Sequence, residues 1–219
     1  MKEYHKIETI FIRDMEGSKK LVEGKFRSKE IEYLKNNKWI FTEKIDGTNI
    51  RIHWDGHKVK FEGRTANSQI PSHLVSKLNE LFGGNTNEEI FEEKFGETEV
   101  ILFGEGYGTK IQNGGLYRQD VSFILFDVLI NNVFLEKENC IEIAKSFNIE
   151  YVPIILEGTI EEAVNYVKSK PKSMIGQANM EGLVGRPEIE LLDKQNNRII
   201  VKIKVCDFEW GIRDEFMDK

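Results

Sequence analysis

The fold of this chain is indicated most sharply by the stretch Glu43-Lys44-Ile45-Asp46-Gly47-Thr48-Asn49, which follows a predicted strand over Trp39–Lys44. A lysine at a strand end, followed by an Asp-Gly turn and a hydrogen-bonding pair, is a candidate nucleophile. Its amine reacts only after losing a proton, which requires partial desolvation and neighbouring positive charge. Taken alone, the stretch is equally compatible with a tight turn that carries a solvated lysine.

A second lysine pair lies in the predicted strand Arg198–Val205. Lys202 and Lys204 are two residues apart, so both point to one face of the strand while Val201 and Ile203 point to the other. Two ammonium groups roughly 7 Å apart can neutralise neighbouring phosphates of a triphosphate. An exposed polar face of an edge strand is the alternative for an isolated pair of this kind.

The rest of the chain mixes helices and strands without regular alternation. Helical spacing and capping residues predict helices over 28–36, 72–82, 87–95, 136–147 and 160–169. Strand patterns cover 39–44, 49–54, 58–61, 100–104, 122–129, 183–186 and 198–205, with a two-residue hairpin turn at Asp55-Gly56. This order predicts an α+β fold with largely antiparallel sheets.

Composition indicates an intracellular protein of one domain. The 219 residues include no membrane-length apolar run, no signal-like N-terminus and only two cysteines, so we expect a cytoplasmic chain with no membrane partner. The net charge of -6 argues mildly against a nucleic-acid partner. That argument is weak for an enzyme, because a concave basic site can coexist with an acidic exterior.

Six short motifs in a fixed order resemble those of the covalent nucleotidyltransferase superfamily, which contains DNA ligases, RNA ligases and capping enzymes. The nick-sealing branch of ATP-dependent RNA ligases is the most similar. The motifs are Lys44–Asn49, Phe61–Thr65, Leu102–Gly108, Phe123–Val128, Met180–Arg186 and Val201–Lys204. Each string alone is short enough to occur by chance, whereas six in order are typical of this superfamily.

The resemblance implies a nucleotidyltransferase (ATP-grasp-like) domain of two antiparallel sheets flanked by helices. We expect residues 1–219 to form a single adenylyltransferase domain. Because only 15 residues follow Lys204, we expect no C-terminal OB-fold, which makes a capping enzyme a poor match.

The implied reaction is ATP-dependent joining of 3′-hydroxyl and 5′-phosphate RNA ends by a monomeric enzyme. A lysine attacks ATP to form lysyl-AMP, AMP passes to the 5′-phosphate, and the 3′-hydroxyl then displaces AMP. The implied cofactors are ATP and Mg²⁺ or Mn²⁺, and the implied partner is RNA, as ends in a nicked duplex. A viral or phage source is compatible with this class.

By resemblance, Lys44 is the nucleophile, and Lys202 and Lys204 bind phosphate. Glu181 is assigned to the metal. Glu105, like Glu181, lies in a glycine-flanked stretch, where a carboxylate suits Mg²⁺ or a ribose hydroxyl. Surface glutamate is the plainer interpretation of either residue alone.

The resemblance assigns the remaining contacts to the nucleotide. Glu105 contacts ribose, Phe126 stacks on the base and Glu43 lies beside it. Asn49 and Arg64 contact the AMP or the nick in the later steps, a task that suits the planar fork of an arginine.

Two other functions remain open at this level. A minimal ATP-dependent DNA ligase would be distinguished by its sealing of DNA rather than RNA nicks. A non-catalytic nucleic-acid-binding module that kept the fold would not form lysyl-AMP despite an intact Lys44.

We predict that Lys202→Ala and Lys204→Ala each lower the rate of adenylylation by about two to three orders of magnitude, as expected for the loss of an active-site phosphate contact. Lys194→Ala is the matched control, because Lys194 lies in a polar turn outside the motif. Single-turnover transfer from labelled ATP measures all three. Equal rates for the three variants would mean that Lys202 and Lys204 are surface residues with no part in adenylylation.

Overall fold

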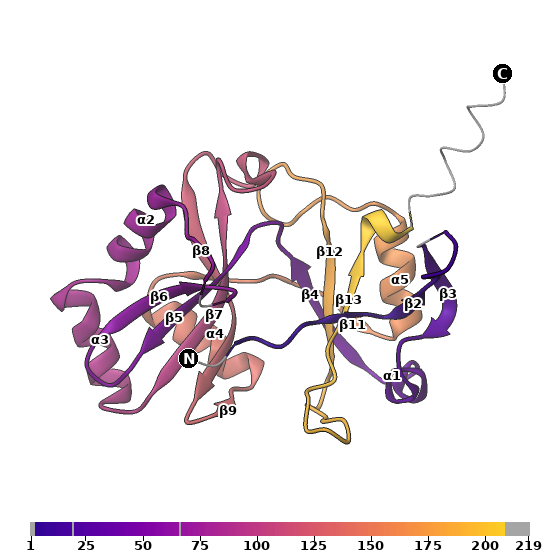
Figure 1. Ribbon diagram of the computed structural model, residues 1–219, viewed down its shortest axis with the longest axis horizontal. Helices are drawn as coiled ribbons and strands as arrows, with labels where there is room; N and C mark the ends of the chain where they lie inside the picture. Colours follow the sequence, from indigo (N-terminus) through magenta and orange to yellow (C-terminus); the bar gives the residue numbers. More distant parts are fainter. Residues whose placement is uncertain (1–2, 19, 66, 209–219) are drawn as a thin grey trace. The chain divides into compact units, whose positions relative to one another are not determined.

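The computed structural model describes residues 3–18, 20–65 and 67–208 and contains two compact units. Unit 1 comprises Met1–His5 and Asp46–Val152, and unit 2 comprises Lys6–Ile45 and Pro153–Lys219. The chain therefore passes between the units three times. Figure 1 traces the elements along the chain.

Unit 1 is built on a 6-stranded sheet in the order β10-β8-β7-β5-β6, with β9 paired to β8. The long strands pair in antiparallel fashion, and only the short β10 runs parallel to β8. The strands are β5 (Thr48–Trp54), β6 (Val59–Gly63), β7 (Val100–Gly108), β8 (Val121–Ile130), β9 (Val133–Phe134) and β10 (Glu150–Tyr151).

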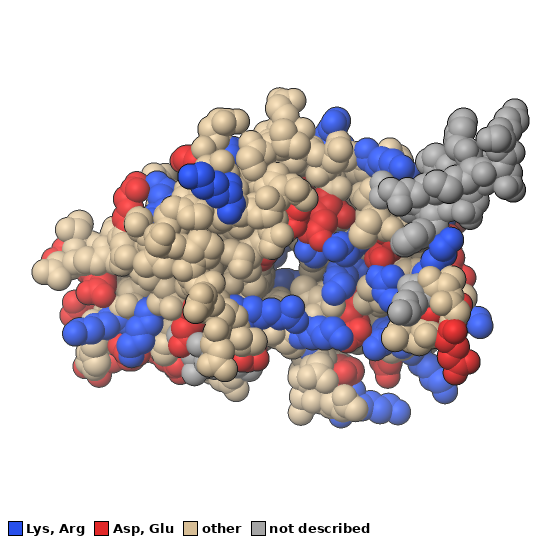
Figure 2. Space-filling view, turned by 45° about the horizontal axis from the view of Figure 1, so that its top comes forward, with Lys and Arg blue, Asp and Glu red and all other residues tan. Residues whose placement is uncertain are grey.

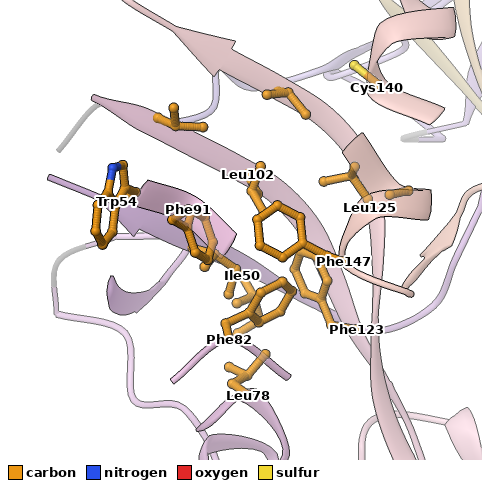
Figure 3. Close-up of a cluster of buried hydrophobic side chains, with 14 of the residues drawn as sticks. Ile50, Trp54, Leu78, Phe82, Phe91, Leu102, Phe123, Leu125, Cys140 and Phe147 are labelled. Atoms are coloured by element: carbon orange, nitrogen blue, oxygen red, sulfur yellow. The ribbon is translucent and has the colours of Figure 1, made fainter. Parts of the chain in front are cut away.

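Three helices pack an aromatic core onto one face of this sheet. They are α2 (Ser72–Phe82), α3 (Asn85–Phe95) and α4 (Lys137–Ser146). The rings of Phe82 and Phe123 meet edge to face at 5.3 Å, and those of Phe91 and Phe147 lie 4.4 Å apart (Figure 3). Ile50, Ile52, Leu102 and Leu125 are among the buried side chains of the sheet on this face.

The opposite face of the unit 1 sheet carries a smaller apolar cluster. It contains Ile101, Phe103 and Leu129, against which Tyr4 and Phe126 pack. Residues of β5 and β7 on this face alternate with those of the aromatic core, as strand geometry requires. The helices thus leave one face of the sheet to polar residues and this small cluster.

Unit 2 is built on a 5-stranded sheet in the order β1-β13-β12-β4-β11 and a 2-stranded sheet of β2 and β3. β12 pairs antiparallel with both β4 and β13, whereas β1 joins the edge of β13 in parallel. The strands are β1 (Glu8–Thr9), β2 (Phe11–Arg13), β3 (Leu21–Phe26), β4 (Trp39–Lys44), β11 (Ile154–Gly158), β12 (Gly182–Pro187) and β13 (Val201–Lys204).

The core of unit 2 lies on one face of the five-stranded sheet. Helices α1 (Lys29–Leu34) and α5 (Ile160–Lys168) cover it with Leu34, Ala163 and Val167, and the sheet contributes Trp39 and Val201 among others. Ser28 caps α1 by accepting a hydrogen bond from the Ile31 N–H at 3.3 Å. Thr159 and Glu162 form a reciprocal capping box at the start of α5.

The predicted α+β class with largely antiparallel sheets is confirmed, and helix 72–82 has the predicted bounds. The predicted end of the 100–104 strand was wrong, because β7 continues through Gly104 and Gly106 to Gly108. The hairpin turn is one residue away from its predicted position. Its central residues are Gly56 and His57, because the Asp55 N–H donates to the carbonyl of Lys58. The strands β1, β2, β3, β9, β10 and β11 were not predicted, and four of them have only two or three residues.

Within the residues that the structure describes, every helix is too short or too polar to cross a lipid bilayer.

We predict that Phe91→Ala lowers the free energy of unfolding by about 3–5 kcal/mol, because it removes a fully buried ring and leaves a cavity. Phe91 has no exposed surface and contacts the rings of Trp54, Phe82 and Phe147. Val133→Ala is the control, since Val133 is 65% exposed and its loss should cost under about 0.5 kcal/mol. Urea unfolding compares the two, and similar small losses would contradict this description of the core.

Candidate active site

Lys44 and Lys204 lie on either side of the first residue of β12. Gly182 pairs with Lys44 on β4 and with Lys204 on β13. Glu181 comes directly before Gly182 and its carboxylate spans both neighbours. Lys44 Nζ donates to Oε2 at 2.6 Å, and Lys204 Nζ lies 2.7 Å from Oε1. One carboxylate therefore holds two amines that are 160 residues apart in the sequence.

Close approach of the strands at Gly182 makes this contact possible. A Cβ atom on Gly182 would lie 2.1 Å from the carbonyl oxygen of Ile203 and 2.8 Å from Cα of Lys204. Neither neighbour is a flexible side chain, so a larger residue would push β13 away. Glycine is therefore needed at this position to keep Lys204 within reach of Glu181.

Strand alternation places the lysines opposite the hydrophobic core, as the sequence predicted for Lys202 and Lys204. In β4 the side chains of Trp39 and Phe41 are buried, whereas Lys44 is half-buried on the other face. In β13 Val201 and Ile203 are buried and Lys202 and Lys204 are half-buried. The lysines thus share one face of the sheet.

The two lysines of β13 have pKa values shifted in opposite directions. Burial lowers the pKa of Lys202, and the positive charges of Lys44 and Lys204 lower it further. Burial also opposes the charged form of Lys204, but the hydrogen bond and charge of Glu181 outweigh it and raise the pKa of Lys204. The positive charge concentrated here suits a ligand with several negative charges, such as a polyphosphate.

Glu43 points to the core side of β4, the opposite face from Lys44. Its carboxylate is 2% exposed and accepts hydrogen bonds from the Ser173 hydroxyl and, at 2.9 Å, from the Met174 N–H. Burial raises the pKa of Glu43, and the two hydrogen bonds oppose this shift. The contacts of the carboxylate are therefore with the 173–174 segment.

In unit 1, Asn49 and Glu105 are direct partners across β5 and β7. Both belong to the sheet face that α2, α3 and α4 leave uncovered. The side-chain oxygen of Asn49 is buried and accepts no hydrogen bond from any residue that the structure describes. A buried acceptor without a donor is costly, so this atom is suited to a donor on a ligand.

Glycines on both sides of Glu105 allow close packing. A Cβ on Gly104 would lie 2.2 Å from the Phe123 ring, and one on Gly106 would lie 2.4 Å from Leu74. Gly47, in the turn after Lys44, also lies close to β7. A Cβ on Gly47 would lie 2.4 Å from the Gly106 carbonyl oxygen and 2.7 Å from Cγ of Glu105. The turn and Glu105 are therefore fixed relative to each other within unit 1.

Phe126 lies at an irregularity in β8. Leu125 pairs with Gly104 and Asp127 pairs with Phe103, which leaves Phe126 without a partner on β7. Such a bulge redirects a side chain. The half-buried ring of Phe126 meets the Tyr4 ring edge to face at 5.1 Å, and the Tyr4 hydroxyl donates to Asp127 at 2.7 Å.

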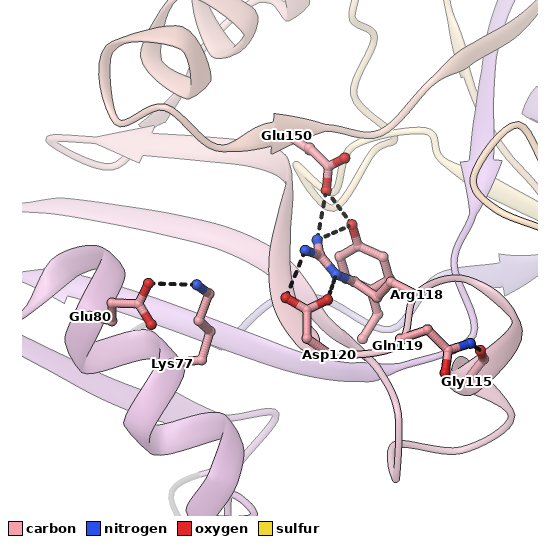
Figure 4. Close-up of polar contacts among 8 residues, drawn as sticks. Lys77, Glu80, Gly115, Arg118, Gln119, Asp120 and Glu150 are labelled. Atoms are coloured by element: carbon pink, nitrogen blue, oxygen red, sulfur yellow. Dashed lines mark hydrogen bonds and ion pairs between the residues drawn. The ribbon is translucent and has the colours of Figure 1, made fainter.

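A polar network supports the loop that contacts Asp46, the first unit 1 residue after Lys44. Asn113 and the Tyr117 hydroxyl contact Asp46 at 3.3 and 3.4 Å. Behind them, Arg118 pairs with Asp120 and Glu150, and its guanidinium lies 5.5 Å from the Tyr107 ring centre (Figure 4). The tight ion pairs make Arg118 a support for this loop rather than an available phosphate ligand.

The RNA ligase family model matches residues 37–204, which include every predicted site residue. The chain belongs to the RNA ligase family. The search of curated proteins gave no match.

Solved structures with the same fold include RNA ligases of Naegleria gruberi. A variant with ATP and Mn is 17% identical with a TM-score of 0.60, covering 80% of this chain and 51% of that one. A variant without ligand is 19% identical with a TM-score of 0.62, covering 82% and 53%. A third, with AMP and Mn, is 18% identical with a TM-score of 0.60, covering 80% and 52%. This RNA ligase family member therefore spans about half the length of those structures, and at such identity the likeness shows the fold alone.

In this member of the RNA ligase family, the carboxylate of Glu181 can serve as one ligand of a divalent metal. Across the residues that the structure describes, no three His, Cys, Asp or Glu side chains converge as a ready metal site. Mg²⁺ is commonly bound by one or two carboxylates together with substrate phosphates and water. Glu181, 17% exposed and already facing two amines, can supply one such oxygen.

The structure brings the predicted residues together in two groups. Lys44, Glu181, Lys202 and Lys204 share one face in unit 2, and Asn49 and Glu105 are neighbours in unit 1. Arg64 is exposed just beyond the end of β6. Sequence reasoning missed the Tyr4 contact with Phe126 and the Asp46 contacts, because both join residues more than 65 positions apart.

We predict that Glu43 makes the protein less stable as the pH rises above the ordinary carboxyl pKa of 4.5. Its pKa in the folded state lies above the ordinary value of 4.5. Below the unfolded-state pKa the protonated carboxyl carries no burial penalty, and the penalty develops as the pH rises through the folded-state pKa.

Glu43→Gln, which cannot ionise, is the matched variant. The unfolding free energy of the variant minus that of the wild type should increase with pH, measured by urea titration at each pH. A difference that stays constant would contradict the shifted pKa of Glu43.

Proposed function

We propose that this chain is an ATP-dependent RNA ligase that joins 3′-hydroxyl and 5′-phosphate ends through a lysyl-AMP intermediate on Lys44. The observation that carries the proposal is the pair of contacts from Glu181 to Lys44 and Lys204, beside Lys202 on the same sheet face. Membership of the RNA ligase family supports the reaction class. The ATP and AMP in the solved relatives support an adenine nucleotide as substrate.

In the first step Lys44 Nζ attacks the α-phosphorus of ATP. A P–N bond forms, the bond to the bridging oxygen breaks, and pyrophosphate leaves with the electron pair. The ammonium must first lose a proton to water, and a metal held by Glu181 would compete with the ammonium for that carboxylate, which lies 2.6 Å from Nζ. The chemistry is phosphoryl transfer, in which positioning and charge neutralisation are the main contributions of a protein.

Lys202 and Lys204 hold the phosphates during this step. Their positive charges offset the charge that develops on the departing pyrophosphate. Mg²⁺ or Mn²⁺, with Glu181 as its protein ligand, would add further neutralisation of the phosphate oxygens. The Mn in the solved relatives supports a divalent metal in this role.

Residues of unit 1 bind the rest of the nucleotide in this proposal. Glu105 accepts a hydrogen bond from a ribose hydroxyl, and Phe126 stacks on the base. Asn49 contacts AMP, and its buried, unsatisfied oxygen supports that role. The exposed guanidinium of Arg64 contacts phosphate of AMP or of the nick. Both units then act as one adenylyltransferase domain.

The later steps transfer AMP and seal the strand. A 5′-phosphate oxygen attacks the phosphorus of lysyl-AMP and displaces the Lys44 amine, which takes up a proton. The 3′-hydroxyl then attacks the activated 5′-phosphorus, and AMP leaves. A nicked duplex is the favoured substrate, because its complementary strand holds both ends in register.

We predict that the protein gains the mass of an AMP group after incubation with ATP and Mg²⁺ and that Lys44→Ala does not. Pyrophosphate treatment beforehand removes any AMP already attached, because the first step is reversible. Intact-mass spectrometry measures the gain. An adduct that persists in the alanine variant contradicts the role of Lys44, and a stripped wild type that never gains mass contradicts the ligase proposal.

We also predict that nicked duplexes containing RNA are sealed faster than single-stranded RNA ends and that binding weakens steeply with salt. The chain has a net charge of -6, and on the face in Figure 2 basic and acidic side chains are interspersed. Substrate affinity should therefore depend on few phosphate contacts and on counterion release. Sealing of RNA, hybrid and DNA nicks over a salt series measures both, and efficient all-DNA sealing at high salt would indicate a DNA ligase instead.

A further inference from the structure

A buried arginine in the middle of β5 has no role in the steps above. Arg51 is 1% exposed and lies on the same sheet face as Asn49, since Ile50 and Ile52 point into the aromatic core. Its partner on β7 is Phe103. Burying a guanidinium is costly unless its charge and its N–H groups are matched. The contacts of Arg51 therefore indicate which part of the structure this residue stabilises.

Two contacts of Arg51 are with the end of β6. The Nε–H of Arg51 donates to the carbonyl oxygen of Gly63 at 2.9 Å, and Nη2 lies 2.8 Å from the Glu62 carboxylate. Both partners are on β6, and Glu62 is also the cross-strand partner of Arg51. A planar guanidinium can engage two such groups at fixed angles, which the single ammonium of a lysine cannot.

The residue that follows this anchored end is Arg64. On its other side, the Thr65 N–H donates to the Ser68 hydroxyl at 3.1 Å, and the Ser68 N–H donates to the Thr65 carbonyl at 3.0 Å. A Cβ on Gly63 would lie 2.6 Å from Cβ of Ser68, so Ser68 lies directly against Gly63. The backbone of Arg64 is thus fixed from both directions while its side chain is exposed.

We propose that Arg51 is a positioning residue that fixes Arg64 for contact with phosphate. The inference rests on the proposed function, in which Arg64 binds phosphate of AMP or of the nick. Arg51 is buried and touches Glu62 and Gly63, so it acts on the reaction through Arg64. A contact displaced by about 1 Å can lower a rate by about a hundredfold, so the position of Arg64 is functionally important.

A double-mutant cycle tests whether the effect of Arg51 on the reaction rate depends on Arg64. The variants are Arg51→Met, Arg64→Ala and the combination, each assayed for single-turnover adenylylation and for sealing of a nick. We expect Arg51→Met to slow the same step as Arg64→Ala, by about tenfold or more. In the Arg64→Ala background, Arg51→Met should slow that step by less than about twofold. The effects of substitutions within one network of contacts are not additive.

Three results would overturn the inference. They are equal losses from Arg51→Met in both backgrounds, a wild-type rate for folded Arg51→Met, and a wild-type rate for Arg64→Ala in every step. Failure of the wild type to form lysyl-AMP is a different outcome, because it refutes the proposed function itself. Melting temperatures accompany each rate, since a purely structural Arg51 would lower stability without coupling to Arg64.

Glu62→Gln provides a second cycle if Arg51→Met does not fold. It removes the charge that pairs with Arg51 and keeps the hydrogen bond from Arg51 to Gly63. Glu62 is 33% exposed, so its replacement should be tolerated. A rate loss that disappears in the Arg64→Ala background supports the inference, and a loss that persists there overturns it.

Discussion

The carboxylate of Glu181 accepts hydrogen bonds from the amines of Lys44 and Lys204, and this contact depends on the strand arrangement of unit 2. β12 has to lie between β4 and β13 so that Gly182 faces both lysines. Gly182 has to lack a side chain, because the Ile203 carbonyl occupies the space of a Cβ. The alternation of β4 and β13 then directs apolar residues to the core and lysines to the opposite face.

Several features of this arrangement could be predicted from sequence because they are local. The two-residue period of Val201–Lys204 determines which side chains share a face. The α2 helix has its predicted bounds because Pro71 and Gly83 flank a run with Leu74 and Leu78 at helical spacing. The caps at Ser28 and Thr159 are likewise local interactions between a side chain and a backbone group three residues later.

Features that depend on distant partners could not be predicted in this way. The glycines of β7 ended the predicted strand at Gly104, because glycine weakens isolated strands. In the structure the same glycines admit the Phe123 ring and the Leu74 side chain, so packing extends the strand. β1 has two residues and pairs in parallel with a strand almost 200 positions later. The buried Arg51 resembled an ordinary polar strand residue, since its partner Gly63 is identified only by the pairing of β5 and β6.

If Glu181 and the lysines around it form a nucleotidyl-transfer site, replacement of Glu181 should impair adenylylation. Glu181→Gln keeps the size of the side chain and removes the charge that holds Lys44 and Lys204. Single-turnover adenylylation over a Mg²⁺ titration should be slower by about two orders of magnitude or more and should require more metal, with an almost unchanged melting temperature. A folded Glu181→Gln variant that adenylylates at the wild-type rate with the wild-type Mg²⁺ dependence would contradict the account.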